Sequence, residues 1–350
     1  MSGKIRRVIN ATAPIRVCDL GGWTDTWFAE KGAVLNIGVY PYAEVQIYVS
    51  ETPPGKDRGV TIYAENYGER YFLPTAPSIA YDRHPLLEAS IDIMELPQNL
   101  SFEVNLFSTA PAGCSTGTSA AVSVALIGAL DLLTPGRMTP HEIASMAHRV
   151  ETEKLGLQCG IQDQLASAYG GICFIEMFQY PYASVSQITV PNSIWWELER
   201  RLVLVYLGRT HSSSDTHKQV IARLDAKDAD KSDLEPLRQA VYAGKDAIQI
   251  GDFEAFGRAM IANTEAQEHL HPALVSDTAK AVIALAKEHG AIGWKVNGAG
   301  GEGGSVSILC GAENEKKRAF IEALPGVDPD LRFIPTYLSR MGVRRWEVED

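Results

Sequence analysis

The sequence lacks the features that would place it in a membrane or outside the cell. Among its 350 residues no apolar run approaches the roughly 18 residues of a membrane-spanning helix. The opening residues, Met1 to Arg7, are not followed by the apolar segment of a secretory signal. The five cysteines are odd in number and widely spaced, and no Cys-x-x-Cys pair occurs, which disfavours a disulfide framework and a zinc site. We therefore expect a cytoplasmic protein without a membrane partner.

Positive charge is also in short supply. Lys and Arg number 32 against 43 Asp and Glu, which gives a net charge of −11. Non-specific binding to nucleic acid needs a basic face, so no nucleic-acid partner is expected. Phosphate ligands are not excluded, because they need only local donors. The content of 45% hydrophobic and 21% charged residues is typical of a globular protein with a sizeable core.

The most informative stretch runs from Pro111 to Ala121, Pro-Ala-Gly-Cys-Ser-Thr-Gly-Thr-Ser-Ala-Ala. It follows an apolar run over 100–108 that predicts a strand, and it precedes an apolar run over 120–133 that predicts a buried helix. A loop of small residues at a helix start favours anions, because backbone N–H groups and the helix dipole face the ligand. The Gly-Lys-Ser/Thr ending of a Walker loop and the dinucleotide glycine spacing are both missing. An ordinary helix start capped by Thr118 or Ser119 is the alternative.

A second polar stretch, residues 13–25, combines Arg16, Asp19 and Asp25 with a Gly21-Gly22 turn and Trp23. Carboxylates accept hydrogen bonds from hydroxyls, and aromatic faces cover the apolar side of a sugar ring. The stretch therefore suits a sugar site. A turn with surface charges is the alternative.

Three carboxylates follow in the middle of the chain. Thr139-Pro-His-Glu142 is a capping box, and it predicts a helix that runs to about Leu155. Glu151 and Glu153 stand near its end and face different directions, so at most one points into a site. Asp163, between two glutamines, suits a general base or an orienting group. Solvated helix charges are the alternative for all three.

The last third of the chain predicts four helices, over 215–224, 234–243, 252–267 and 276–289. Before them, a strand over 203–206 leads into Arg209 and His211, which suit either a polar ligand or a solvated loop. After them, a cluster of glycines lies between two strand-like runs. So dense a cluster indicates backbone that must approach another group closely. Its members are Gly298, Gly300, Gly301, Gly303 and Gly304.

Taken in order, four of these segments resemble the signature motifs of the galactokinase, homoserine kinase, mevalonate kinase and phosphomevalonate kinase (GHMP) superfamily. Residues 13–25 are similar to the substrate-side motif, and residues 111–120 resemble the phosphate loop. Residues 159–164, Cys-Gly-Ile-Gln-Asp-Gln, are similar to the galactokinase form of the catalytic-aspartate segment, and residues 295–304 resemble the third, glycine-rich motif. The resemblance covers nearly the whole chain.

The resemblance implies an α+β fold of two domains with the site in the cleft between them. The N-terminal domain, residues 1–190, would be like the second domain of ribosomal protein S5. The C-terminal domain, residues 191–350, would be ferredoxin-like.

It also implies ATP and Mg²⁺ as cofactors and a role for each matching residue. Asp163 would act as base or orienter at the attacking hydroxyl, and Arg16 would stabilise the transferred phosphoryl group. Ser119 and Glu153 would hold Mg²⁺, with Glu151 in reserve. The nucleotide would be bound by Pro111, Ala112, Gly113, Cys114, Ser115, Thr116, Gly117, Thr118 and Ser119. The substrate would be bound by Asp19, Gly22, Trp23, Asp25, Arg209, His211, Gly298, Gly300 and Gly301.

The form Gly-Gly-Trp-Thr-Asp at residues 21–25 resembles the heptose 7-phosphate and fucose kinase branches, whereas galactokinases carry Gly-Glu-His-Thr-Asp. We therefore expect a sugar 1-kinase with a small-molecule sugar or sugar phosphate as its substrate. A kinase of mevalonate or homoserine type and a catalytically silent sugar sensor are the alternatives. Ser115, Thr116 and Glu302 depart from the family pattern and leave nucleotide contacts open. The particular sugar, its phosphorylation state and the oligomeric state stay open as well.

Overall fold

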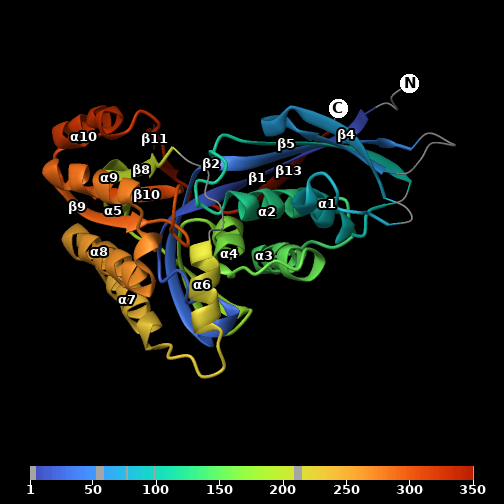
Figure 1. The fold of residues 1–350 in the computed structure, drawn as a ribbon. Coiled ribbons are helices and arrows are strands. Elements are labelled where there is room, and N and C mark those ends of the chain that lie inside the picture. The colour runs from blue at the N-terminus through green and yellow to red at the C-terminus, as the bar shows by residue number, and fades with distance from the viewer. Residues whose placement is uncertain (1–4, 53–58, 76–77, 98, 209–214, 350) are drawn as a thin grey trace.

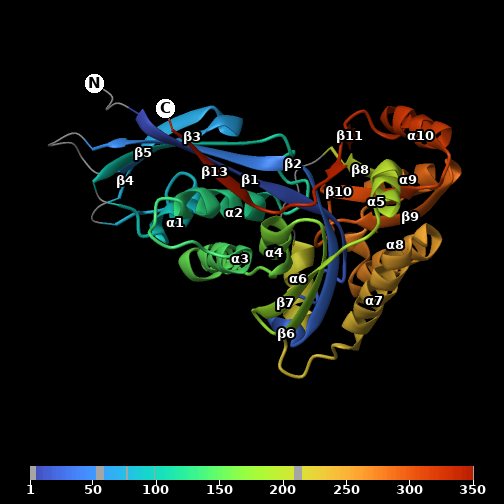
Figure 2. The same cartoon turned by 180° about the vertical axis from the view of Figure 1, so that it is seen from behind.

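The computed structural model describes residues 5–52, 59–75, 78–97, 99–208 and 215–349. The described strands form two sheets, and most of the elements over residues 192–334 gather around the smaller one (Figures 1 and 2). The N- and C-terminal ends lie close together at the far end of the larger sheet (Figure 1).

The larger sheet is built on two long antiparallel strands, β1 (Ile5–Leu20) and β2 (Gly32–Glu51). Their pairing continues through three shifts of register, between Ile5 and Arg7, between Pro14 and Ile15 and between Val17 and Leu20. The sheet follows the order β13-β1-β2-β5-β3-β4, while β12 and β6 also pair with β2 and β7 pairs with β6. The other strands are β3 (Gly59–Ala64), β4 (Glu69–Pro74), β5 (Leu100–Ser108), β6 (Ile172–Gln179), β7 (Tyr182–Ile188), β12 (Tyr337–Leu338) and β13 (Arg344–Glu349).

Four helices, α1 to α4, lie along one face of this sheet (Figures 1 and 2). Their bounds are α1 (Pro85–Asp92), α2 (Thr118–Asp131), α3 (Pro140–Arg149) and α4 (Gln162–Tyr169). Helix α2 is apolar on all sides and is buried from Ala120 onward except at Val122, as expected for a helix inside the core. The capping box of Thr139 and Glu142 is confirmed at the start of α3.

The smaller sheet has the order β11-β8-β10-β9, and all of its pairs are antiparallel. Its strands are β8 (Leu202–Tyr206), β9 (Ala291–Val296), β10 (Ser305–Cys310) and β11 (Arg332–Ile334). The helices around it are α5 (Asn192–Arg201), α7 (Glu235–Ile250), α8 (Phe253–Leu270), α9 (Asp277–Glu288) and α10 (Asn314–Val327), whereas α6 (Asp215–Leu224) lies beside α4 (Figures 1 and 2). Helices follow β8 and β10 in the chain, so the unit reads β-α-β-β-α-β, which confirms the ferredoxin-like prediction.

The end of the chain returns to the larger sheet, where β12 pairs with β2 and β13 pairs with β1. The division into residues 1–190 and 191–350 stays a prediction. Strands β12 and β13 fall within residues 191–350, yet they pair with strands of the larger sheet. None of the helices among the described residues combines the length and the apolar character needed to cross a bilayer.

Candidate active site

The sequence-predicted segments meet at one cavity of about 270 Å³. Its walls come from the end of β1 and the turn after it, the start of α2, the turn before α4, α4 itself, α6 and the glycine cluster. Arg16, Trp23, Asp25, Ser119, Asp163 and Gly298 all line it. Segments far apart in the chain are therefore brought together as the resemblance implied.

Arg16 and Asp163 form an ion pair at this cavity, with Nε of Arg16 donating to Oδ1 of Asp163 at 2.8 Å. Nη1 of Arg16 also donates to the carbonyl oxygen of Ser115 at 2.5 Å. Burial alone would lower the pKa of Arg16, but the carboxylates of Asp163 and Asp19 more than offset this and raise it. The guanidinium therefore stays charged and ties the aspartate to the phosphate loop.

The phosphate loop ends in left-handed backbone that brings the start of α2 against Asp163. Gly117 precedes the helix with φ +68°, and a Cβ atom there would lie 3.2 Å from Cγ of Asp163. Ser115 is also left-handed, at φ +57°. Neither Thr118 nor Ser119 caps α2, so the capping alternative is wrong and Ser119 lies exposed at the cavity. The first N–H groups of a helix have no partner within the helix, and so they suit an anion.

The glycine cluster and the residue after it pack against the phosphate loop. The Ser305 hydroxyl donates to the carbonyl oxygen of Cys114 at 2.6 Å. A Cβ atom on Gly298 would lie 3.1 Å from Cβ of Ser115. Gly300 and Gly301 do not line the cavity: a Gly300 Cβ would lie 2.3 Å from the carbonyl oxygen of Leu274. These two glycines serve packing instead of the predicted substrate contact.

Asp19 also differs from its predicted role. It is fully buried, and both of its carboxylate oxygens accept from the backbone N–H of Gly298, at 3.0 and 3.1 Å. Arg16 and the buried Lys295 each approach Oδ1 of Asp19 to 3.7 Å. Asp19 is not among the residues lining the cavity, so it fastens the glycine segment to β1 instead of meeting a sugar. Gly22 packs behind it, because a Cβ atom there would lie 3.0 Å from Oδ2 of Asp19.

Further hydrogen-bonding groups line the cavity beside Asp163. Asp25 is buried and accepts from the backbone N–H of Gln162 at 3.0 Å, and burial raises its pKa to about 6. Nε1 of Trp23, Oε1 of Gln162 and Oε1 of Gln164 are buried without a partner. Buried polar atoms without partners are rare in proteins, and a ligand hydroxyl or water would satisfy them.

The two candidate metal carboxylates lie in different surroundings. Glu151 lines the cavity, accepts from Nε2 of Gln164 at 2.7 Å, and has its pKa raised to about 7 by burial. Glu153 is exposed, and its pKa is lowered by a hydrogen bond from Arg149 at 3.0 Å. The preference for Glu153 is therefore corrected in favour of Glu151. A turn of π-helix over Val150–Lys154 replaces the expected α-helix here and changes which side chain faces inward.

Some residues and contacts of the site were not indicated by any motif in the sequence. His217 of α6 lines the cavity, its ring 5.7 Å from that of Trp23, and no motif pointed to it. Lys295 begins the third motif, but nothing in the sequence indicated that it would pair with Asp19. Arg209 and His211 lie outside the described residues. Glu302 is exposed and does not line the cavity.

Comparison with known proteins finds relatives that share one family. Residues 86–171 match the family described as GHMP kinases N terminal domain. The chain is 25% identical over 358 residues to a D-glycero-alpha-D-manno-heptose 7-phosphate kinase of Campylobacter jejuni, which covers 98% of this chain and 100% of the relative. It is 30% identical over 257 residues to a mevalonate kinase of Thermococcus gammatolerans, which covers 70% of this chain and 69% of the relative.

Among solved structures, a D-glycero-D-manno-heptose 1-phosphate kinase from Bacteroides thetaiotaomicron superposes with a TM-score of 0.75 at 22% identity. The match covers 98% of this chain and 100% of that one. The likeness confirms the two-domain α+β architecture.

Fold and sequence together define a phosphotransferase that acts on a hydroxyl group of a small molecule. More particularly, the chain belongs to the GHMP kinase family. Membership in this family implies ATP as the phosphoryl donor. The heptose phosphate kinases, which match over nearly the whole chain, belong to the sugar kinase branch of the family.

Proposed function

We propose that this protein is a sugar kinase that transfers the γ-phosphate of ATP to the anomeric hydroxyl of a sugar or sugar phosphate and yields a sugar 1-phosphate. The observation that carries the proposal is the Arg16–Asp163 ion pair against the start of α2, beside a wall of hydrogen-bonding groups. Two relatives that match nearly the whole chain are named heptose phosphate kinases, which supports a sugar as acceptor.

In this proposal the chain supplies positioning and charge, which phosphoryl transfer needs more than covalent chemistry. The first N–H groups of α2 bind the terminal phosphates. Asp163 orients the attacking hydroxyl and accepts its proton, while Arg16 offsets the negative charge on the transferred group.

The residues at the cavity fit Mg²⁺. Among the described residues no group of three or more His, Cys, Asp and Glu side chains gathers as a metal site. Mg²⁺ in kinases is commonly held by one or two carboxylates together with the nucleotide phosphates, so such a group is not required. Ser119 and Glu151 would hold the ion at this cavity, and when bound it neutralises charge on the phosphates.

The charge of the cavity favours a sugar over a mevalonate-type acceptor. Asp25, Glu151 and Asp163 line it, and Arg16 is already paired with one of them. A substrate carboxylate beside this lining would be repelled, whereas the hydroxyls of a sugar can donate to it; the phosphate of a sugar phosphate would have to lie outside it. A silent sugar sensor would share the binding wall, and only turnover separates it from a kinase.

The test is ADP release with ATP, Mg²⁺ and a panel that contains a heptose 7-phosphate, the free heptose, fucose, galactose, mevalonate and homoserine. We expect turnover with one of the sugars, and phosphorus–carbon coupling in the NMR spectrum should place the new phosphate on C1. The 1-O-methyl glycoside of the best sugar is the matched control, because its anomeric hydroxyl is blocked. Turnover of that glycoside, or of mevalonate alone, overturns the proposal.

A further inference from the structure

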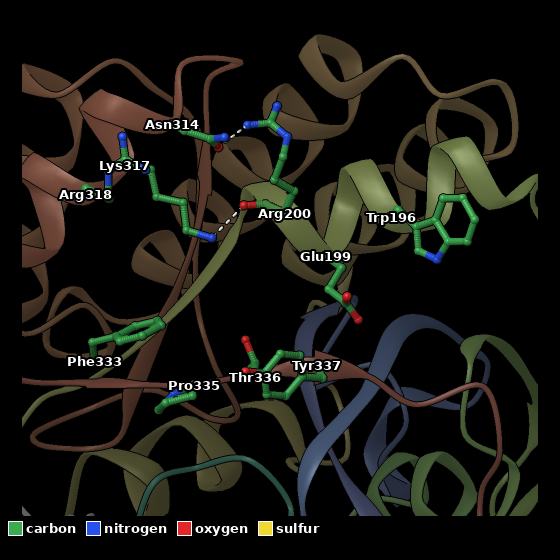
Figure 3. A pocket seen from close by; sticks show the side chains of 10 residues that line it. All are labelled: Trp196, Glu199, Arg200, Asn314, Lys317, Arg318, Phe333, Pro335, Thr336 and Tyr337. Carbon is green, nitrogen blue, oxygen red and sulfur yellow. Dashed lines mark hydrogen bonds between the residues drawn. The ribbon is translucent and has the colours of Figure 1, made fainter.

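A second cavity, of about 590 Å³, lies away from the catalytic one and shares none of its lining residues. It is bounded by α5, by the first turns of α10 and by the segment that joins β11 to β12 (Figure 3). That segment carries the chain from the smaller sheet back to the larger one. A ligand in this cavity therefore contacts elements of both sheets.

Aromatic rings line this cavity and remain open to water. Trp196 is 61% exposed, Tyr337 is 61% exposed and Phe333 is 36% exposed. Phe333 lies in β11, Tyr337 begins β12 and Trp196 extends from α5, with Tyr337 between the other two rings (Figure 3). Apolar surface gathered in one concavity is typical of a binding site, whereas scattered exposed rings need no explanation.

The same cavity carries cations that protein carboxylates do not neutralise. Nζ of Lys317 donates to the carbonyl oxygen of Arg200 at 2.5 Å, and burial lowers the pKa of this lysine. Within the described part of the chain, no ion pair is found for Lys317 or Arg318. Arg200 differs, because Glu197 accepts from its guanidinium at 2.5 and 2.8 Å.

The one carboxylate lining the cavity, among the described residues, is that of Glu199. It accepts from the backbone N–H of Leu338 at 2.8 Å and so fastens α5 to β12. Lys317 and Arg318 therefore outnumber the one carboxylate in the lining, whose charge this hydrogen bond leaves in place, on a chain whose net charge is −11. This local excess of positive charge favours an anionic ligand.

We propose that this cavity binds a nucleotide, with its phosphate at Lys317 and Arg318 and its base against Tyr337, which lies between the other two rings (Figure 3). Stacking on aromatic side chains accepts any base, since every base presents a flat face. The volume lies inside the range of about 300–1,000 Å³ typical of small-molecule sites. The proposal concerns binding alone and does not rest on the kinase activity.

The experiment measures binding of guanosine 5′-monophosphate (GMP) by calorimetry, with a non-hydrolysable ATP analogue present at saturation to fill the catalytic cavity. We expect one further equivalent of GMP to bind. Lys317→Glu and Arg318→Glu should each weaken this binding about tenfold or more, because each replaces an attractive charge by a repulsive one. Lys316→Glu is the matched control, since Lys316 is a neighbour in α10 that pairs with Glu313 and does not line the cavity.

A second arm separates the two halves of the ligand. Tyr337→Leu should weaken GMP binding about tenfold and leave the binding of inorganic phosphate unchanged. Guanosine and inorganic phosphate should each bind more weakly than GMP.

The proposal is overturned if no further equivalent binds, if both charge reversals leave GMP affinity unchanged, or if inorganic phosphate or a hexose 1-phosphate binds as tightly as GMP. Failure of the ATP analogue to bind would count against the kinase proposal alone, because the Lys317 and Arg318 variants still report on this cavity.

Discussion

At the scale of single residues, Glu151 and Glu153 show how two neighbouring carboxylates receive different chemistry. Spacing alone favoured Glu153, whereas the π-helical turn leaves it exposed beside Arg149 and directs Glu151 into the cavity. The identities of Arg16, Asp25, Asp163 and Ser119 as cavity residues followed from motifs. The inward carboxylate could not be predicted, because one extra residue in a helical turn has no clear sequence signature.

We predict that Glu151→Gln raises the Mg²⁺ concentration for half-maximal activity about tenfold or more, since the variant loses a metal carboxylate. The glutamine retains an oxygen that can accept from Gln164, which preserves the local packing. Glu153→Gln is the control and should leave the Mg²⁺ requirement unchanged. Titrating Mg²⁺ in the turnover assay checks both, and the reverse pattern would restore Glu153 as the ligand.

A second residue-scale prediction concerns Asp25, whose pKa rises from 3.8 to about 6 in the folded protein through burial. Between these values the folded state holds a proton that the unfolded state releases. This carboxyl group therefore stabilises the fold fully below pH 3.8, and the stabilisation is lost as pH rises through about 6.

The loss amounts to roughly 3 kcal/mol, and Asp25→Asn should remove it. Urea unfolding at pH 4.5, 5.5 and 7.5 checks the prediction, with the ligand-free protein and its variant measured side by side. The variant should gain stability relative to the unaltered protein as pH rises. Parallel curves would show that Asp25 does not titrate in this range.

At the scale of elements, sequence patterns within a segment predicted those strands and helices that form through interactions within the segment. The strand over 100–108, the capping box of α3 and the helix over 215–224 are confirmed. Helix α5 was missed: it occupies the stretch in which a domain break was expected, and only Trp195 and Leu198 of it are buried. Its apolar residues Ile194, Trp195 and Leu198 do have helical spacing, but the helix is only 10 residues long.

The contact between β10 and the phosphate loop gives an element-scale prediction. Ser305→Ala removes the donor to Cys114 and should raise KM for ATP several-fold with little change in kcat, because it loosens the loop. The two lost hydrogen bonds, to Cys114 and from Nδ2 of Asn297, should also cost about 1–3 kcal/mol of stability. Ser307→Ala is the matched control: it lies on the same buried strand and loses a bond of 2.9 Å to Asn297, which is not part of the loop. Equal KM values for the two variants would contradict the support assigned to Ser305.

At the scale of the whole molecule, the end of the chain closes the larger sheet beside its beginning. Neither β12 nor β13 was predicted, because each is short and depends on partners some 300 residues away. The two-domain architecture and the convergence of four motifs were predictable, since the family resemblance carries long-range information that periodicity lacks.

Arg345 fastens this closing strand to α2, with Nη1 of Arg345 donating to the buried Asp131 at 2.5 Å. We predict that Arg345→Met lowers the free energy of unfolding by about 3–5 kcal/mol, because it leaves Asp131 charged and buried without its cation. Arg7→Met, which breaks an exposed pair with Glu347 on the same two strands, should cost no more than about 1 kcal/mol. Urea unfolding compares the two variants, and similar losses would contradict the role of Arg345.

The claim that joins all three scales is that Asp163, held by Arg16 against the start of α2, performs phosphoryl transfer. The most direct test is kcat of Asp163→Asn with the best sugar, beside the control Asp246→Asn, whose side chain is 76% exposed. We predict that kcat falls about 10²–10⁴-fold for Asp163→Asn, the usual range for a positioned acid or base, and is unchanged for the control. A folded Asp163→Asn protein that turns over as fast as the unaltered enzyme would contradict the account.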